Sequence, residues 1–145
     1  MTTKLKENKI PSSISIENIT VESFENPDGS KTIGLQYGAI GLCEFSDNIT
    51  EDNIEAIKQE ICTIYNKQLI ADNTFLKLMA RYIRHIDKYN KGMWTNRLDF
   101  NTEETYSAFI SGLVSSLYAY INAYISDRVA NAIHQPLNLD MILTN

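Results

Sequence analysis

Hydrophobic residues near the C-terminus follow helical spacing from about Tyr106 to Ser126, and no charged residue interrupts them. One apolar series recurs at steps of four and three: Tyr106, Ile110, Leu113, Leu117, Ile121 and Tyr124. Small residues recur at the same spacing, and we expect them on a side of the helix adjacent to the apolar series. They are Ala108, Gly112, Ser115, Ala119, Asn122 or Ala123, Ser126 and Ala130. A helix that is apolar almost all round is typical of a surrounded element. We therefore expect either the rest of the chain or other copies of it to enclose this helix.

Alternating apolar and polar residues in the first third of the chain predict a small antiparallel sheet. Residues 14–16 and 19–21 alternate as half-buried strands do, with an irregularity between them at Glu17–Asn18. A returning strand is predicted over residues 32–37. Ile33, Leu35 and Tyr37 are expected on one face of this strand.

The turn between these strands is predicted at Glu25–Ser30. Pro27 presets one backbone dihedral angle, and the following Asp-Gly pair supplies the positive φ that a tight hairpin needs. Residues 39–45 form either a third strand or an irregular extension. Glycine at positions 34, 38 and 41 is too frequent for a regular central strand, which indicates a bend or a bulge.

Two helices are predicted after the sheet. The first begins at Thr50, whose side chain can cap free backbone donors, and runs to about Ile70. The second is expected over about 75–90, because apolar residues recur there at steps of four and three. Residues 72–74 provide a break and a new cap before it, and Gly92 suits a left-handed cap after it.

The last and longest helix is expected to begin at Asn101, with Glu104 three residues later in a capping-box arrangement. It ends before Pro136, which cannot continue the backbone hydrogen bonds. A helix of about 33 residues spans about 50 Å. A domain of this length has a radius of gyration of about 15 Å, so one end of the helix is expected to extend beyond its own domain.

These elements predict an α+β fold in which a small N-terminal antiparallel sheet packs with three helices, the last one long. We expect a flexible arm over residues 1–13, one domain over 14–135 and an apolar tail over 136–145. The alternating apolar residues of the tail suit a strand or arm lying on its own core or on a neighbour.

Composition narrows the classes of protein that fit the sequence. Hydrophobic residues make up 43% and charged residues 21%, so wholesale disorder is not expected. A net charge of -5 argues against a surface that binds nucleic acid everywhere, although a local basic face remains compatible with it. The preference for Ile, Asn, Lys and Tyr suggests an AT-rich genome, such as those of many low-GC bacteria and their phages.

The polar segment Met1–Lys9 contains no apolar stretch, so we expect no secretory signal and a cytoplasmic location, or a virion if a phage encodes the chain. In that setting Cys43 and Cys62 are expected to be buried hydrophobic residues and not a disulfide. The segment 106–126 is long enough to cross a bilayer, but its serines and tyrosines are unlike an inserted helix. We therefore predict no membrane association.

Positive charges concentrate at the end of the second helix. Arg81, Arg84, Lys88 and Lys91 are spaced three, four and three residues apart, so they share one helix face, and Trp94 and Arg97 follow. One interpretation is a site for an anionic ligand, a nucleotide, nucleic acid or an acidic partner, with Trp94 available for stacking. The other is a solvated face whose cations suit the negative end of the helix dipole.

The last helix also carries tyrosines, which are enriched at protein interfaces. Together with the small residues they predict a helix-to-helix oligomer interface. Its expected members are Ala108, Gly112, Ser115, Ala119, Ala123, Tyr120 and Tyr124. The alternative interpretation is that these tyrosines fill the core of the monomer.

Motifs that carry chemistry are missing from the sequence. It contains no Gly-x-Ser-x-Gly, no phosphate-binding glycine loop and no metal-ligand spacing of His or Cys. We therefore predict no catalytic activity, no metal and no cofactor. The functional hypothesis is a self-associating interaction protein, such as a phage or mobile-element structural or host-interaction factor. The alternative is a binding module for an anionic ligand.

Overall fold

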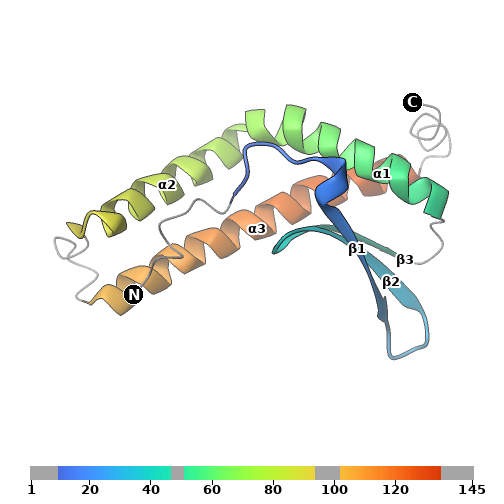
Figure 1. Cartoon of the computed structure of the whole chain (residues 1–145), viewed down its shortest axis with the longest axis horizontal. Coiled ribbons are helices and arrows are strands. Elements are labelled where there is room, and N and C mark those ends of the chain that lie inside the picture. The colour runs from blue at the N-terminus through green and yellow to red at the C-terminus, as the bar shows by residue number, and fades with distance from the viewer. Residues whose placement is uncertain (1–9, 47–50, 94–101, 135–145) are drawn as a thin grey trace. The chain divides into compact units, whose positions relative to one another are not determined.

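The computed structural model describes residues 10–46, 51–93 and 102–134, and it confirms the predicted α+β fold (Figure 1). A three-stranded antiparallel sheet comes first in the chain, and three helices follow it. The chain divides into two compact units. The helical unit comprises Met1–Pro11 and Ala71–Ala119, and the sheet unit comprises Ser12–Ile70 and Tyr120–Asn145. The long last helix therefore contributes its first half to the helical unit and its second half to the sheet unit.

The sheet has the strand order β1-β2-β3, with β1 at Ile19–Glu25, β2 at Lys31–Tyr37 and β3 at Ile40–Ser46. The two edges are therefore β1 and β3. A strand over residues 14–16 was the wrong prediction, because the chain forms a 3-10 turn at Ile16–Asn18 before β1 begins. The third strand, which the sequence left open, is present.

The β1–β2 turn has the geometry that the Asp-Gly pair predicts. The Gly29 N–H donates to the Asn26 carbonyl at 2.9 Å, and the Asn26 N–H donates to the Ser30 carbonyl at 2.7 Å. Gly29 has a φ of 89°, a conformation that L side chains rarely adopt. This is a type I turn closed by a left-handed glycine, a common three-residue hairpin loop.

The predicted bulge lies in β3. Leu35 pairs with Cys43 and the next residue, Gln36, pairs with Gly41, so Leu42 is an extra residue in the ladder. The bulge breaks the alternation of the strand. As a result the consecutive residues Leu42 and Cys43 are both buried.

The helix predicted to end near Ile70 has three parts. The α-helix α1 covers Glu51–Thr63, and a π-helical turn at Ile64–Gln68 and a 3-10 turn at Leu69–Ala71 continue it. The π-turn carries Asn66, whose side-chain amide bonds to both backbone groups of Ile14. Asn66 Oδ1 accepts from the Ile14 N–H at 2.8 Å, and Nδ2 donates to the Ile14 carbonyl at 2.9 Å. This pair of bonds holds the segment before β1 against the π-turn.

In the helical unit, α2 covers Asn73–Asn90, and both of its predicted caps are confirmed. Asp72 Oδ2 accepts from the Phe75 N–H at 3.0 Å. At the other end Gly92 has a φ of 73°.

The long helix α3 covers Glu103–His134, and its capping box differs from the predicted one. The Thr105 N–H donates to Thr102 Oγ1 at 3.1 Å, and the Thr102 N–H donates to Thr105 Oγ1 at 3.3 Å. Thr102 is therefore the N-cap, and Thr105 takes the position predicted for Glu104. Asn101, the predicted cap, lies outside the described residues.

Candidate functional site

One side of α3 is buried from Tyr106 to Val129. The buried series is Tyr106, Ile110, Leu113, Leu117, Ile121, Ile125 and Val129. The prediction is confirmed as far as Ile121, but Tyr124 was the wrong final member, because the step after Ile121 is four residues and leads to Ile125. Tyr124 itself is half-buried.

The small residues occupy the opposite side of α3. Each one follows a buried residue by two positions, which is about 200° around a helix. The predicted members Ala108, Gly112, Ser115, Ala119 and Ala123 are all exposed. We call these five residues the small-residue face. The expectation that this face lies beside the apolar series was wrong, because it lies on the far side of the helix from the core.

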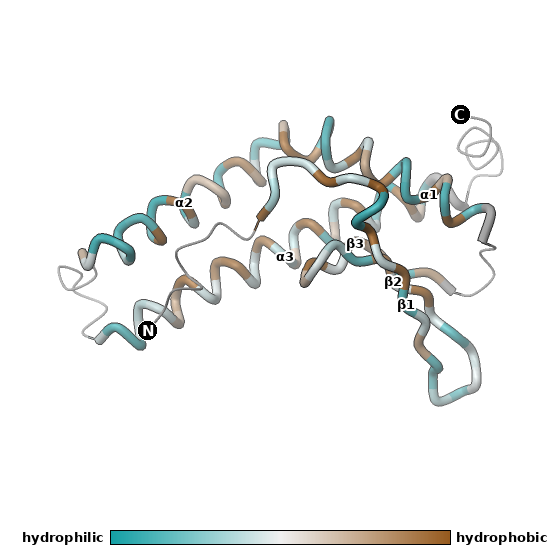
Figure 2. Tube along the Cα trace, in the orientation of Figure 1, coloured by the Kyte–Doolittle hydropathy of each residue, from teal (hydrophilic) through white to brown (hydrophobic). Residues whose placement is uncertain are grey.

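The small-residue face is uncharged, which is unusual for an exposed helix surface. No Asp, Glu, Lys, Arg or His occurs between Thr105 and Ser126. A solvated helix face normally carries such residues. In Figure 2 the tube of α2 has strong teal segments towards its end, whereas much of the first half of α3 is white to brown. Charge depletion of this kind is a feature of the centre of protein interfaces.

Tyrosines flank the small-residue face in the sheet unit. Tyr120 and Tyr124 are half-buried, and their ring centroids lie 6.0 Å apart. The Arg128 guanidinium carbon lies 3.4 Å from the centroid of the Tyr124 ring, and Nη1 of Arg128 donates to the Tyr124 carbonyl at 3.2 Å. The cation and the helix carbonyl therefore hold the Tyr124 ring in place, so one aromatic side chain beside the face is already ordered.

Two polar residues assigned to the small series have a different role. Asn122 Nδ2 donates to the Gly41 carbonyl at 2.9 Å, and Ser126 Oγ donates to the Leu42 carbonyl at 3.4 Å. Both carbonyls belong to the bulged edge strand β3. These bonds attach α3 to the sheet. The sequence left open whether Asn122 or Ala123 belongs to the small series, and Ala123 is the exposed one of the two.

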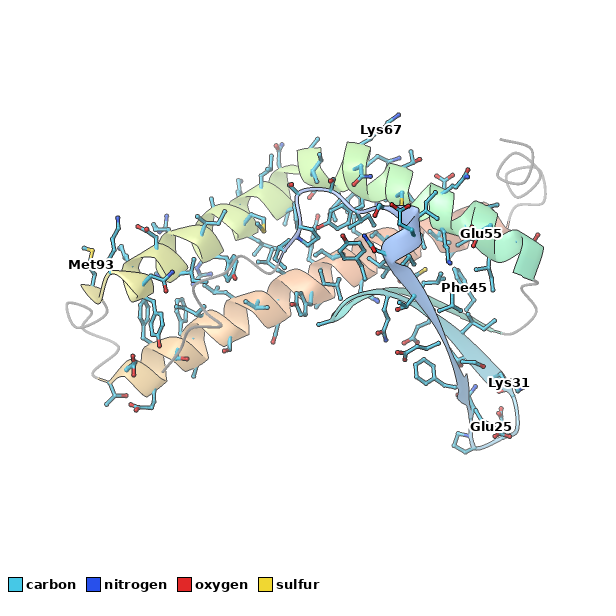
Figure 3. The ribbon with its side chains drawn as sticks, in the orientation of Figure 1. Glu25, Lys31, Phe45, Glu55, Lys67 and Met93 are labelled. Atoms are coloured by element: carbon cyan, nitrogen blue, oxygen red, sulfur yellow. The ribbon has the colours of Figure 1, made fainter. Side chains whose placement is uncertain are left out.

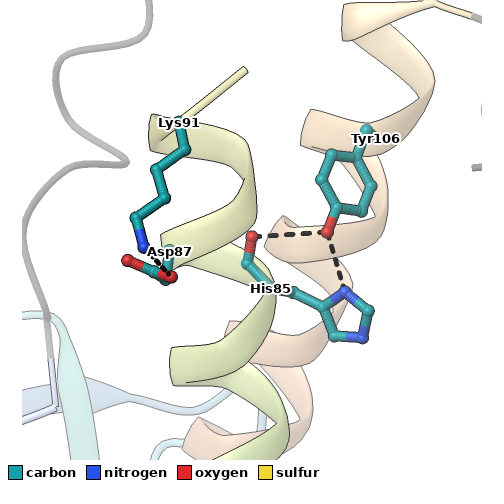
Figure 4. Close-up of polar contacts among 4 residues, drawn as sticks. All are labelled: His85, Asp87, Lys91 and Tyr106. Carbon is teal, nitrogen blue, oxygen red and sulfur yellow. Dashed lines mark hydrogen bonds and ion pairs between the residues drawn. The ribbon is translucent and has the colours of Figure 1, made fainter. Parts of the chain in front are cut away.

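A buried aromatic cluster lies between α2 and α3 in the helical unit (Figure 4). Tyr106 Oη donates to the His85 carbonyl oxygen at 3.3 Å and forms a second hydrogen bond of 2.8 Å with Nδ1 of the same histidine. The His85 ring also meets the Phe109 ring edge to face, with centroids 4.9 Å apart. His85 lies beside a basic residue in the sequence, yet its side chain is buried. His85 lies three residues after Tyr82 and four before Tyr89, and this helical spacing places it on the same buried face as the two tyrosines.

The basic residues of α2 are present on its outer side. Arg81, Arg84 and Lys91 are exposed and Lys88 is half-buried. Lys91 Nζ forms an ion pair with Asp87 Oδ2 at 3.1 Å, and the Arg81 guanidinium lies 5.6 Å from the Phe109 ring centroid. Trp94 and Arg97 lie outside the described residues. Two of the four cations in the described part of this face therefore have contacts within the helical unit.

The sheet unit holds two free thiols, Cys43 and Cys62. Burial raises the pKa of the Cys43 thiol from 9.0 to about 12, and the Glu44 carboxylate adds to the shift. Burial also raises the pKa of Cys62, with a smaller contribution from Glu17. Within residues 10–46, 51–93 and 102–134, no group of three or more His, Cys, Asp or Glu side chains is placed to hold a metal ion.

No protein-family model, no curated protein and no solved structure matches the chain. By length and composition, one helix among the described residues, Glu103–Asn131, is long and apolar enough to cross a membrane. The core helix of a soluble protein meets the same criterion. Of the most apolar stretch of this helix, 28% is buried inside the structure, where Asn122 contacts β3 and Tyr106 contacts α2.

Proposed function

We propose that this protein is a non-catalytic interaction protein that associates with copies of itself through the small-residue face of α3. The observation that carries the proposal is the exposure of this face opposite the core, over a stretch with no charged side chain. Small side chains allow two helix backbones to approach closely. Contact between two such faces buries alanines and the flanking tyrosines without desolvating a charge.

Contact between the small-residue faces of two copies also suits a two-fold axis, because an isologous interface pairs the same surface of both subunits. The AT-rich composition and the absence of enzyme motifs support a phage or mobile-element structural or host-interaction factor, acting in the cytoplasm or in a virion. In this proposal the protein needs no cofactor and no membrane.

Gly112→Leu is expected to abolish self-association and leave the monomer folded. A β-carbon at Gly112 meets no atom within 4 Å, so the larger side chain fits the monomer, and leucine favours a helix more than glycine by about 0.8 kcal/mol. Across a close helix contact the same leucine collides with the other copy. Sedimentation velocity measures the mass, and circular dichroism checks the fold.

Gly112→Ala is the matched control, because it changes the same position and keeps the side chain small. It is expected to retain the oligomer. If Gly112→Leu keeps the oligomer as well, the interface does not include this face. If both variants lose it, helix propensity and not size is responsible, and the proposal fails.

The alternative function, a binding module for an anionic ligand, is supported by the exposed Arg81 and Arg84 on one face of α2. Its test is the binding of inorganic polyphosphate by Arg81→Gln/Arg84→Gln, over a range of salt concentrations. A phosphate-binding face gives steeply salt-dependent binding that the double variant removes. Binding that persists in the double variant places the ligand elsewhere.

A further inference from the structure

The strand β1 is an open sheet edge. It has a hydrogen-bonded neighbour only on the β2 side, and its residues after Ile19 are all exposed. The Ile19 N–H donates to the Ile16 carbonyl, and among the described residues Thr20–Glu25 make no backbone hydrogen bond beyond the ladder with β2. Figure 3 shows Glu25 and Lys31 near the tip of the hairpin, away from Glu55 of α1.

The alternation of an antiparallel ladder identifies which backbone groups are free. The Asn26 N–H points across the hairpin to Ser30, and the β1–β2 register is regular up to that point. Even-numbered residues of β1 therefore bond to β2. The N–H and carbonyl groups of Val21, Ser23 and Glu25 point to the open side.

The two edges of the sheet differ in how they are protected. Proteins commonly block an edge with a bulge, a proline, a lysine or a covering element. Edge β3 has a bulge, and α3 binds two of its carbonyls. Edge β1 is a regular strand of seven residues that contains no proline and no lysine. It is available to pair with another strand.

The outer face beside this edge combines an aromatic ring with carboxylates. A Phe24 ring atom lies 3.1 Å from the position of a β-carbon on Gly34, so the ring covers the glycine, and Phe24 remains 42% exposed. In the register, Glu22 lies opposite Gly34, and Gly34 lies opposite Glu44. Two exposed carboxylates therefore stand on either side of the ring. Such a site suits a Lys or Arg side chain, which gains both charge pairing and a cation–π contact.

Charge also disfavours a second copy of β1 as the occupant of this edge. From Ile19 to Tyr37 the hairpin carries Glu22, Glu25 and Asp28 against the single cation Lys31. Full-length antiparallel pairing of two β1 strands would place Glu22 opposite the Glu22 of the other copy, and like charges directly opposite are destabilising.

We propose that β1 is a docking edge for a positively charged, extended segment of a partner protein, which adds a fourth strand to the sheet. The free backbone groups of Val21, Ser23 and Glu25 provide the pairing. Phe24, Glu22 and Glu44 select Lys or Arg at one position of the incoming strand. This surface is independent of the small-residue face of α3.

The probe is an acetylated heptapeptide of alternating lysine and valine. On binding, amide hydrogen exchange is expected to slow at Val21, Ser23 and Glu25, while Thr20, Glu22 and Phe24, already bonded to β2, change little. The control peptide has the same charges but N-methylated backbone amides, and it is expected not to produce this protection. No added protection with the first peptide, or equal protection with both, overturns the proposal.

Two sets of variants separate strand pairing from simple charge attraction. Ser23→Pro removes one outward N–H at a position where an edge tolerates proline, and it is expected to weaken binding at least about tenfold relative to Ser23→Ala. Glu22→Gln/Glu44→Gln is expected to weaken binding about tenfold at low salt. The control Glu55→Gln/Glu60→Gln removes the same net charge from α1 and should have little effect.

An equal loss of affinity in both double variants contradicts the proposed recognition, because it reports only the net charge of the protein. Protection of Val21 and Ser23 that rises with protein concentration in the absence of peptide also contradicts it. That result would assign the edge to a second copy of the chain.

Discussion

Tyr106→Ala is expected to lower the free energy of unfolding by about 3–5 kcal/mol. The ring is fully buried in the helical unit, where it contacts both His85 and Phe109. Removing it leaves a cavity and also leaves the buried His85 ring without its hydroxyl partner. Total stabilities are about 5–15 kcal/mol, so the variant is expected to unfold in much less denaturant than the native protein.

Tyr106→Phe separates the hydroxyl from the ring. It is expected to cost about 1–3 kcal/mol, because Nδ1 of a buried histidine loses a bond of 2.8 Å. The matched control is Tyr118→Phe on the same helix, a half-buried tyrosine whose hydroxyl should contribute little. Urea denaturation measures all three variants. Equal stability of Tyr106→Phe and the native protein would contradict the bond between α2 and α3.

The second large effect concerns the thiol of Cys43. A pKa of about 12 in place of 9.0 leaves about a thousandfold less thiolate at neutral pH, and the side chain is only 1% exposed. Alkylation of Cys43 by iodoacetamide in the folded protein is therefore expected to be slower by about a thousandfold or more than in the unfolded chain. Cys62 is the internal control and should react first, since it is half-buried. Fast labelling of Cys43 in the native protein would contradict the burial of this side chain next to the bulge in β3.

The same shift predicts the pH dependence of stability. A thiol whose pKa is raised on folding favours the folded state while it is protonated. This contribution is complete below about pH 9 and is lost as the pH rises towards about 12. The raised pKa of Tyr65, also caused mainly by burial, acts in the same direction above pH 10. Cys43→Ala should make the alkaline decrease in unfolding free energy smaller.

Local signals in the sequence predicted much of the fold. The Asp-Gly pair placed the hairpin, Asp72 and Gly92 bounded α2, and helical spacing identified the buried side of α3 as far as Ile121. Each of these features depends on a few neighbouring residues. Their backbone preferences act within one turn, so the sequence is sufficient to predict them.

The features that were missed depend on contacts between distant parts of the chain. Asn66 meets Ile14 only because a π-turn interrupts the first helix, and no local pattern predicts that turn. Asn122 matched the small series by spacing, yet its bond to Gly41 turns it towards the sheet. The capping box moved by one residue because Thr102 and Thr105 can bond to each other as well as Asn101 and Glu104 could.

The candidate surfaces were predicted to different degrees. The residues of the small-residue face could be identified by spacing, but spacing alone did not reveal that the face lies opposite the core. The open edge of β1 could not be predicted, because edge and central strands have similar local patterns until their neighbours are known. Its acidic residues and Phe24 become one surface only through the register with Gly34 and Glu44.

The most direct test of the proposed self-association is the native mass of the purified protein, measured by native mass spectrometry. Self-association through the small-residue face predicts a defined multiple of 16.5 kDa for the unmodified chain and 16.5 kDa for a folded Gly112→Leu. A monomer of 16.5 kDa at all accessible concentrations would contradict it, and would leave α3 with an exposed uncharged face that no second copy covers.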